Sequence, residues 1–116
     1  MITTHVLDTA RGKPAQGVPI TLSRQRKGGF DELGRGVTDA DGRLRTLVPA
    51  GHEVAPGVYA LVFDTAAYFK AIAVEGFYPV AVIHFVVTEA EVREKGGHYH
   101  VPLLLSPFGY STYRGS

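Results

Sequence analysis

Two apolar stretches decide the fold class of this chain: VYALVFD at residues 58–64 and VAVIHFVVT at residues 80–88. Both stretches are rich in β-branched and aromatic residues, which fit the pleated surface of a sheet. Neither approaches the roughly 18 consecutive apolar residues that a membrane-spanning helix needs. We therefore expect two strands here, and they are the strongest strand signals in the sequence.

The same kind of signal recurs on both sides of these stretches. Residues 18–24 alternate apolar Val18, Ile20 and Leu22 with smaller or polar residues, and this period of two is typical of a half-buried strand. Further strands are predicted at residues 2–8, 43–48, 99–105 and 108–114. The proline at position 102 favours an edge position or a bulge for its strand.

Glycine and proline, 14 and 7 residues, separate these short runs instead of gathering in one block. The sequence TDADG at residues 38–42 predicts a turn, because aspartate caps local amides and glycine accepts a positive φ. Residues 64–72 predict a helix of about two turns behind Asp64. Residues 88–97 carry a capping-box pattern and predict either a single turn or a loop. About eight strands and one short helix indicate an all-β antiparallel sandwich, a single domain over residues 1–116.

Composition excludes several classes of protein. Hydrophobic residues make up 45% and charged residues 20% of the chain, as in ordinary globular domains. The 12 basic and 11 acidic residues leave a net charge of +1, which argues against a dedicated nucleic-acid binder. The lack of cysteine excludes disulfides, thiolate metal sites and cysteine nucleophiles. The first residues resemble no signal peptide, so we expect a cytoplasmic protein with no membrane partner.

Histidines are the first candidates for chemistry. His98 and His100 form H-Y-H on a predicted strand, where a spacing of two puts both on one face. With His5 as a third ligand they could hold a metal. The alternative is metal-free acid–base chemistry, in which His5 or His100 takes a proton from water and Arg43 stabilises an oxyanion. The remaining two histidines, His52 and His84, are read as structural.

Basic residues gather in the first half of the chain. The set can be a solvated face or a site for an anionic or carbonyl-rich small molecule. Its members are Arg24, Arg26, Lys27, Arg35, Arg43 and Arg45. No G-x-S-x-G elbow and no phosphate-cradling glycine loop is present.

Three segments in order carry a family resemblance: THVLDTARGKPAQGVPITL at residues 4–22, TDADGRL at 38–44 and HYHVPLLLSPFGYSTYRGS at 98–116. Together they resemble the 5-hydroxyisourate hydrolases, the transthyretin-related enzymes of purine catabolism. The final YRGS is the most specific of these marks. The resemblance implies a transthyretin-like sandwich of two four-stranded sheets, and a homotetramer, a dimer of dimers, with active sites at the dimer–dimer interface.

The resemblance also implies an activity and its residues. The reaction is hydrolysis of 5-hydroxyisourate, the product of urate oxidation, to 2-oxo-4-hydroxy-4-carboxy-5-ureidoimidazoline, with no cofactor and no metal. The implied catalytic residues are His5, Arg43 and His100. The implied substrate-binding residues are His5, Arg43, Tyr113, Arg114 and Ser116.

Two questions stay open at this level. Either His5 or His100 can be the general base, and Arg45 and His98 can be supporting or simply exposed residues. A different function class is a small-molecule carrier of the transthyretin kind, which binds hormone without chemistry. The His, Arg, His and YRGS set favours the hydrolase, because a carrier needs no acid–base groups.

Overall fold

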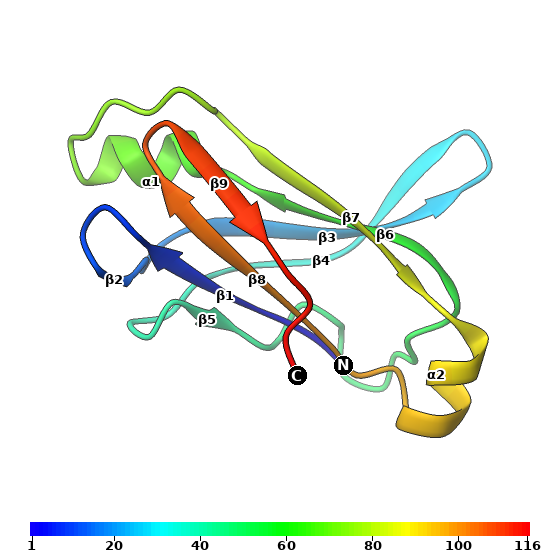
Figure 1. The fold of residues 1–116 in the computed structure, drawn as a ribbon. Coiled ribbons are helices and arrows are strands. Elements are labelled where there is room, and N and C mark those ends of the chain that lie inside the picture. Colours follow the sequence, from blue (N-terminus) through cyan, green and yellow to red (C-terminus); the bar gives the residue numbers. More distant parts are fainter.

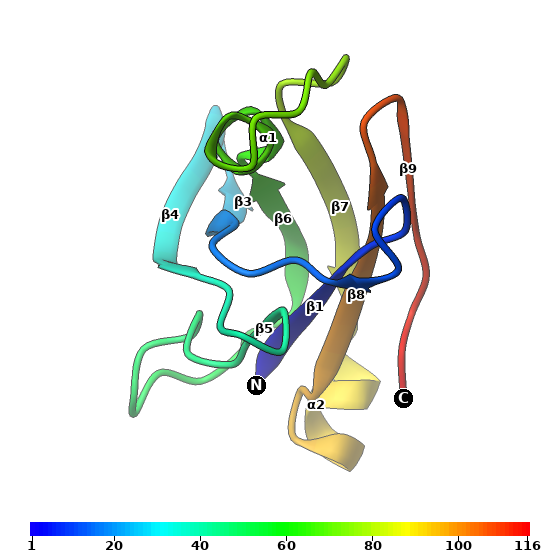
Figure 2. The same ribbon diagram turned by 90° about the vertical axis from the view of Figure 1, so that its left-hand side faces the viewer.

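Two β-sheets face each other in the computed structural model, which describes residues 1–116 (Figures 1 and 2). One sheet has the order β2-β1-β8-β9, and β5 also pairs with β1. Its strands are β1 (Ile2–Asp8), β2 (Lys13–Pro14), β5 (Arg43–Leu44), β8 (Tyr99–Ser106) and β9 (Gly109–Thr112). The other sheet has the order β4-β3-β6-β7. Its strands are β3 (Pro19–Arg26), β4 (Gly29–Val37), β6 (Gly57–Phe63) and β7 (Ala81–Val87).

The predicted sandwich is confirmed, with two differences: the first sheet has five strands where the resemblance implied four, and one strand pair differs in direction. All strand pairs are antiparallel except β1 and β8, which run parallel from Ile2 beside Tyr99 to Asp8 beside Leu105. Nearly a hundred residues separate these partners, so no local hairpin forces them to be antiparallel. The pair brings the N-terminal and C-terminal segments together in the middle of one sheet.

Two short helices connect the strands. Helix α1 (Thr65–Ala71) follows β6 as predicted, and the Asp64 carboxylate accepts the Ala67 N–H at 3.0 Å. Helix α2 (Glu89–Lys95) occupies the segment for which the sequence left a turn or a loop open. Thr88 caps its start and Gly96, with φ of +68°, ends it in the left-handed conformation. Neither helix is long and apolar enough to cross a membrane.

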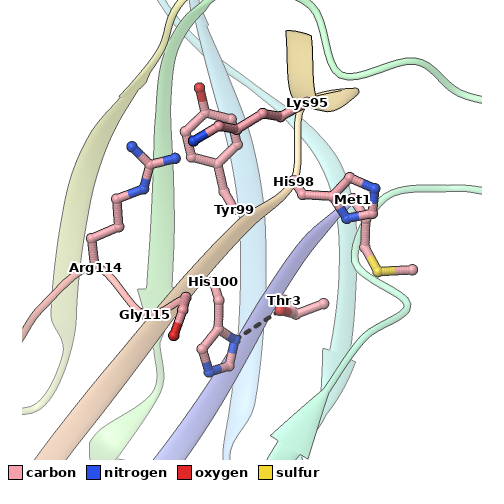
Figure 3. A pocket seen from close by; sticks show the side chains of 9 residues that line it. Met1, Thr3, Lys95, His98, Tyr99, His100, Arg114 and Gly115 are labelled. Atoms are coloured by element: carbon pink, nitrogen blue, oxygen red, sulfur yellow. Dashed lines mark hydrogen bonds between the residues drawn. The ribbon is translucent and has the colours of Figure 1, made fainter. Parts of the chain in front are cut away.

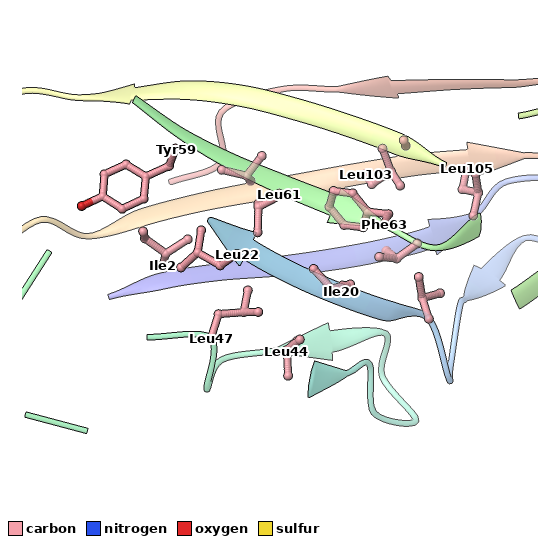
Figure 4. Close-up of a cluster of buried hydrophobic side chains, with 14 of the residues drawn as sticks. Ile2, Ile20, Leu22, Leu44, Leu47, Tyr59, Leu61, Phe63, Leu103 and Leu105 are labelled. Atoms are coloured by element: carbon pink, nitrogen blue, oxygen red, sulfur yellow. The ribbon is translucent and has the colours of Figure 1, made fainter. Parts of the chain in front are cut away.

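The core lies between the sheets and is built by alternation along the strands (Figure 4). Along β1, Ile2, Thr4 and Val6 are buried while Thr3 and His5 are only half-buried. The period of two therefore points the second set away from the core, onto the outer face of the sheet. Large core side chains from the facing strands include Ile20, Leu22, Leu61, Phe63, Leu103 and Leu105.

Pro102 lies in the central strand β8, between β1 and β9, so the edge position predicted for its strand is wrong. The Tyr99 N–H donates to Met1 O, so odd-numbered residues of β8 direct their N–H toward β1. The missing N–H of Pro102 therefore falls on the β9 side, where β9 stops with Thr112 opposite Leu103. The proline ends the ladder and lets the C-terminal tail leave the sheet.

Candidate active site

His5 and Arg43 form a cross-strand pair on the outer face of the first sheet. They are direct partners in the antiparallel β1–β5 ladder, so their side chains share one face. The inward neighbours, Thr4 and Leu44, are buried, which assigns His5 and Arg43 to the outer side. Two residues that lie 38 positions apart in the sequence thus become neighbours through register alone.

The TDADG turn fixes the backbone of Arg43. The Asp39 carboxylate accepts the N–H groups of Asp41 and Arg43, both at 2.9 Å, as the turn prediction requires. Gly42 has φ of +74°, and a Cβ there would lie 2.4 Å from Val6 O. Only glycine fits this close approach, so the turn holds Arg43 directly against β1.

His100 lies on the same outer face, on the other side of β1. Its partner in the parallel ladder is Thr3, and the Thr3 hydroxyl is 2.8 Å from the His100 Nδ1 atom. Burial lowers the pKa of His100 below its ordinary value, and the charges of Arg43, His5 and Arg45 lower this pKa further. His100 is therefore neutral near pH 7 and able to accept a proton.

A cavity of about 400 Å³ opens beside His100 (Figure 3). Its wall includes the chain terminus at Met1, and the side chains of Lys95, His98, Arg114 and Ser116 also line it. Most of these groups are donors or cations, which suits a ligand rich in carbonyl oxygens. His5 and Arg43 do not line this cavity; they lie further along the same sheet face.

The three predicted substrate-binding residues of the tail take different places. Ser116 reaches the cavity, and the Gly115 N–H donates to His100 O at 2.9 Å, which brings the chain end to the histidine. Arg114 lines the cavity, but its guanidinium binds the Glu91 carboxylate. Tyr113, with 57% of its surface exposed, lines a second hollow between β7 and β8 in which none of the predicted catalytic residues takes part.

The wider basic set does not form one patch. Arg26 pairs with Asp31 at 2.7 Å, Arg35 pairs with Glu32, and Arg24 donates to Pro56 O. These arginines belong to β3 and β4 of the second sheet, and only Arg43 and Arg45 act on His100. A site for an anionic or carbonyl-rich molecule at Arg43 and Arg45 stays a prediction; the structure shows that their charges lower the pKa of His100.

The metal alternative has no geometric support. His98 is exposed ahead of β8, and no group of three or more histidine, aspartate or glutamate side chains is placed to hold a metal ion. His52 and His84, which the sequence suggests are structural, are both exposed and lie outside the cavity. Thr3, in contrast, was not singled out from the sequence; its position two residues before His5 on one strand face was the available signal.

Comparison with known proteins adds the family. The sequence pattern of the HIUase/Transthyretin family matches residues 2–115. The chain belongs to this family. A 5-hydroxyisourate hydrolase of Mus musculus is 44% identical over 117 residues, which span 99% of this chain and 94% of the relative. The resemblance stated from the sequence motifs is confirmed, and the curated hydrolase relatives also confirm that this family member is an enzyme.

The solved structures similar to this chain include both a hydrolase and a transthyretin. The 5-hydroxyisourate hydrolase of Klebsiella pneumoniae superimposes with a TM-score of 0.81 at 38% identity, over 99% of this chain and 98% of that chain. Sea bream transthyretin in complex with thyroxine superimposes with a TM-score of 0.86 at 34% identity, over 98% and 93% of the two chains. The transthyretin-like fold is thus confirmed, while fold alone does not separate an enzyme from a carrier.

Proposed function

We propose that this protein hydrolyses 5-hydroxyisourate to 2-oxo-4-hydroxy-4-carboxy-5-ureidoimidazoline in urate breakdown. One observation carries the proposal: His5, Arg43 and His100 share the outer face of one sheet, and the surroundings of His100 keep it neutral. A neutral imidazole beside an arginine is the pair that amide hydrolysis needs, a base for water and a cation for the oxyanion. The hydrolase relatives, which match nearly the whole of this chain, support the same substrate.

The proposed reaction is a general-base hydrolysis without a metal. His100 or His5 removes a proton from water, whose oxygen attacks a carbonyl carbon of the six-membered ring. Arg43 holds the substrate and stabilises the negative charge that builds on the carbonyl oxygen. The ring C–N bond then breaks, the nitrogen takes the proton, and a carboxylate and a ureido group remain.

Thr3 supports His100 as the base. If the Nδ1–H of His100 donates to the Thr3 hydroxyl, the Nε2 atom carries a free lone pair and can accept the proton of water. His5 then orients the water or the substrate from the neighbouring position on β1. Ser116 and Lys95, which line the cavity, bind the polar edge of the substrate, while Tyr113 and Arg114 are substrate-binding residues by the family resemblance alone.

A homotetramer is part of the same proposal. Several large apolar side chains are strongly exposed in the isolated chain, among them Phe77 at 69%, Phe108 at 71% and Val86 at 61%. Exposed apolar surface of this kind favours association of copies. Sedimentation at micromolar concentration is expected to give the mass of four chains. A fully active monomer would contradict the assembly.

The cytoplasmic location also stays a prediction, which cell fractionation tests.

The deciding experiment follows freshly made 5-hydroxyisourate by ultraviolet spectroscopy, with and without the protein. The protein is expected to accelerate loss of the substrate, with the same rate in the presence of a chelator. Chelator-sensitive activity that zinc restores would overturn the metal-free mechanism.

The likeness to transthyretin bound to thyroxine favours a carrier as the second candidate. No acceleration, together with tight binding of an iodinated phenol, would establish that function instead.

A further inference from the structure

The C-terminal tail controls the space around His100. After β9 ends at Thr112 the chain leaves β8, and it returns at Gly115, whose N–H donates to His100 O at 2.9 Å. A Cβ built on Gly115 would lie 2.5 Å from the His100 Cδ2 atom, so the tail backbone packs directly against the imidazole ring. A shift of the tail backbone therefore changes the packing around the His100 ring and the orientations open to it.

Arg114 is the side chain that anchors this tail. Its two terminal nitrogens bind both oxygens of the Glu91 carboxylate, and the Nη1–Oε1 distance is 3.1 Å. Its guanidinium carbon also lies 4.7 Å from the centre of the Tyr99 ring. Figure 3 shows the Arg114 side chain alongside Tyr99 and directed away from His100. A bidentate ion pair over an aromatic face holds an arginine in one geometry.

The start of α2 makes Glu91 available for this contact. The Thr88 hydroxyl accepts the Glu91 N–H at 3.2 Å, as in a capping box. In a complete capping box the Glu91 carboxylate would bind the Thr88 N–H in return. Here the Thr88 N–H donates to the Tyr99 hydroxyl at 3.2 Å. The Glu91 carboxylate, on a side chain of which only 24% is exposed, is therefore available to bind Arg114 of the tail.

We propose that Glu91 is a positioning residue of the active site, which holds Gly115 and Ser116 against His100 through Arg114. Arg114 is then the anchor of the tail and not a group that contacts substrate, which revises the role that the family resemblance gives it. The inference rests on the proposed hydrolase function, because it takes the surroundings of His100 to be the site. It makes Glu91 and Arg114 one functional unit.

The test measures three variants: Glu91→Ala, Arg114→Ala and the double variant that combines them. Glu94→Ala is the control. Glu94 lies on the same helix, and its replacement by alanine removes the same charge as Glu91→Ala. Because Glu94 makes no ion pair, this replacement breaks no contact with the tail. Each single variant is expected to lower kcat about tenfold with KM within about twofold, and the double variant to be no slower. Glu94→Ala is expected to retain the full rate. Thermal unfolding of each variant checks that the fold is intact.

A second measurement does not depend on activity. Hydrogen exchange of the Gly115 amide, followed by NMR, is expected to become about tenfold faster in Glu91→Ala and in Arg114→Ala, and to stay unchanged in Glu94→Ala. This readout separates the two proposals: faster exchange in a protein without hydrolase activity contradicts the proposed function and leaves the anchor in place. Full activity of Glu91→Ala beside a slow Arg114→Ala, additive losses, or unchanged Gly115 exchange would each overturn the positioning role.

Discussion

His84 on β7 and His100 on β8 both point to the outer face of their sheets, but their surroundings differ. His84 on β7 is exposed and stacks on the Phe30 ring, with the ring centres 5.3 Å apart, and it makes no side-chain hydrogen bond. His100 on β8 is half-buried, bonds to Thr3 and lies near two arginines and His5. The residue type is the same, but β7 is an edge strand and β8 lies inside its sheet, so the position of the strand and the partners across it together decide which imidazole can act as a base.

The largest effect is expected from removing the base itself. His100→Ala is expected to lower kcat/KM about a hundredfold or more, because general bases contribute at least that much. Arg43→Ala and His5→Ala are expected to lower kcat/KM by a similar factor. Arg43→Ala removes the cation that stabilises the oxyanion, and His5→Ala removes the group that orients the water or the substrate. The matched change His84→Ala is expected to stay within about twofold. Steady-state kinetics on folded variants measures all four, and a nearly active His100→Ala would remove this residue from the mechanism.

A smaller loss is expected from displacing His100 without removing it. In Gly115→Ala the new methyl group meets His100 Cδ2 at 2.5 Å and must push either the ring or the tail aside. We expect a roughly tenfold lower kcat, as small displacements of reacting groups cost rate steeply. The control is Gly109→Ala in β9, where the nearest atom, Ser106 Oγ, is 3.7 Å away. Equal activity of the two variants would show that the contact with the tail is unimportant.

The hydrogen bond between Thr3 and His100 is a further difference between the two histidines, because His84 has no such partner. Thr3→Val removes the hydroxyl at nearly constant volume and is expected to lower kcat roughly fivefold, the factor that about 1 kcal/mol gives. Thr3→Ser keeps the hydroxyl and is expected to retain most of the rate. The pair is compared by steady-state kinetics across pH. Equal losses in both variants would mean that Thr3 acts only through packing.

The smallest expected effect is a shift in the titration of His100. Arg43→Gln removes a charge that opposes protonation, so the pKa of His100 should rise toward its ordinary value of 6.5. Because folding lowers this pKa, the unfolded chain binds the proton more readily, and the free energy of unfolding falls as the pH drops below about 6.5. The variant should reduce that fall.

NMR titration of the histidine Cε1–H signals measures this shift directly. Arg35→Gln is the control, since Arg35 lies on the second sheet and binds Glu32. It is expected to leave the His100 titration unchanged. A His100 titration that does not move in Arg43→Gln would contradict the proposed closeness of the two charges.

Local patterns determined much of the architecture. The β-branched stretches, the Asp64 cap and the TDADG turn all appear in the structure as the sequence predicts. Strand β4 (Gly29–Val37) was missed, because its glycines and charged residues signal a turn. The structure gives those glycines a different purpose: a Cβ on Gly34 would lie 1.9 Å from Leu47 O, so this strand needs glycine where another segment crosses it closely.

The motifs T-H-V-L-D, D-G-R and H-Y-H identified His5, Arg43 and His100 by residue number, and the sequence by itself could do no more than name them. Their meeting is a matter of register, His5 opposite Arg43 and Thr3 beside His100, and register between strands some 40 to 100 residues apart is set by tertiary packing. The same holds for Glu91, whose sequence signal is a helix cap. Only the fold brings Arg114 within reach of it, because a contact across 23 residues leaves no local pattern to read.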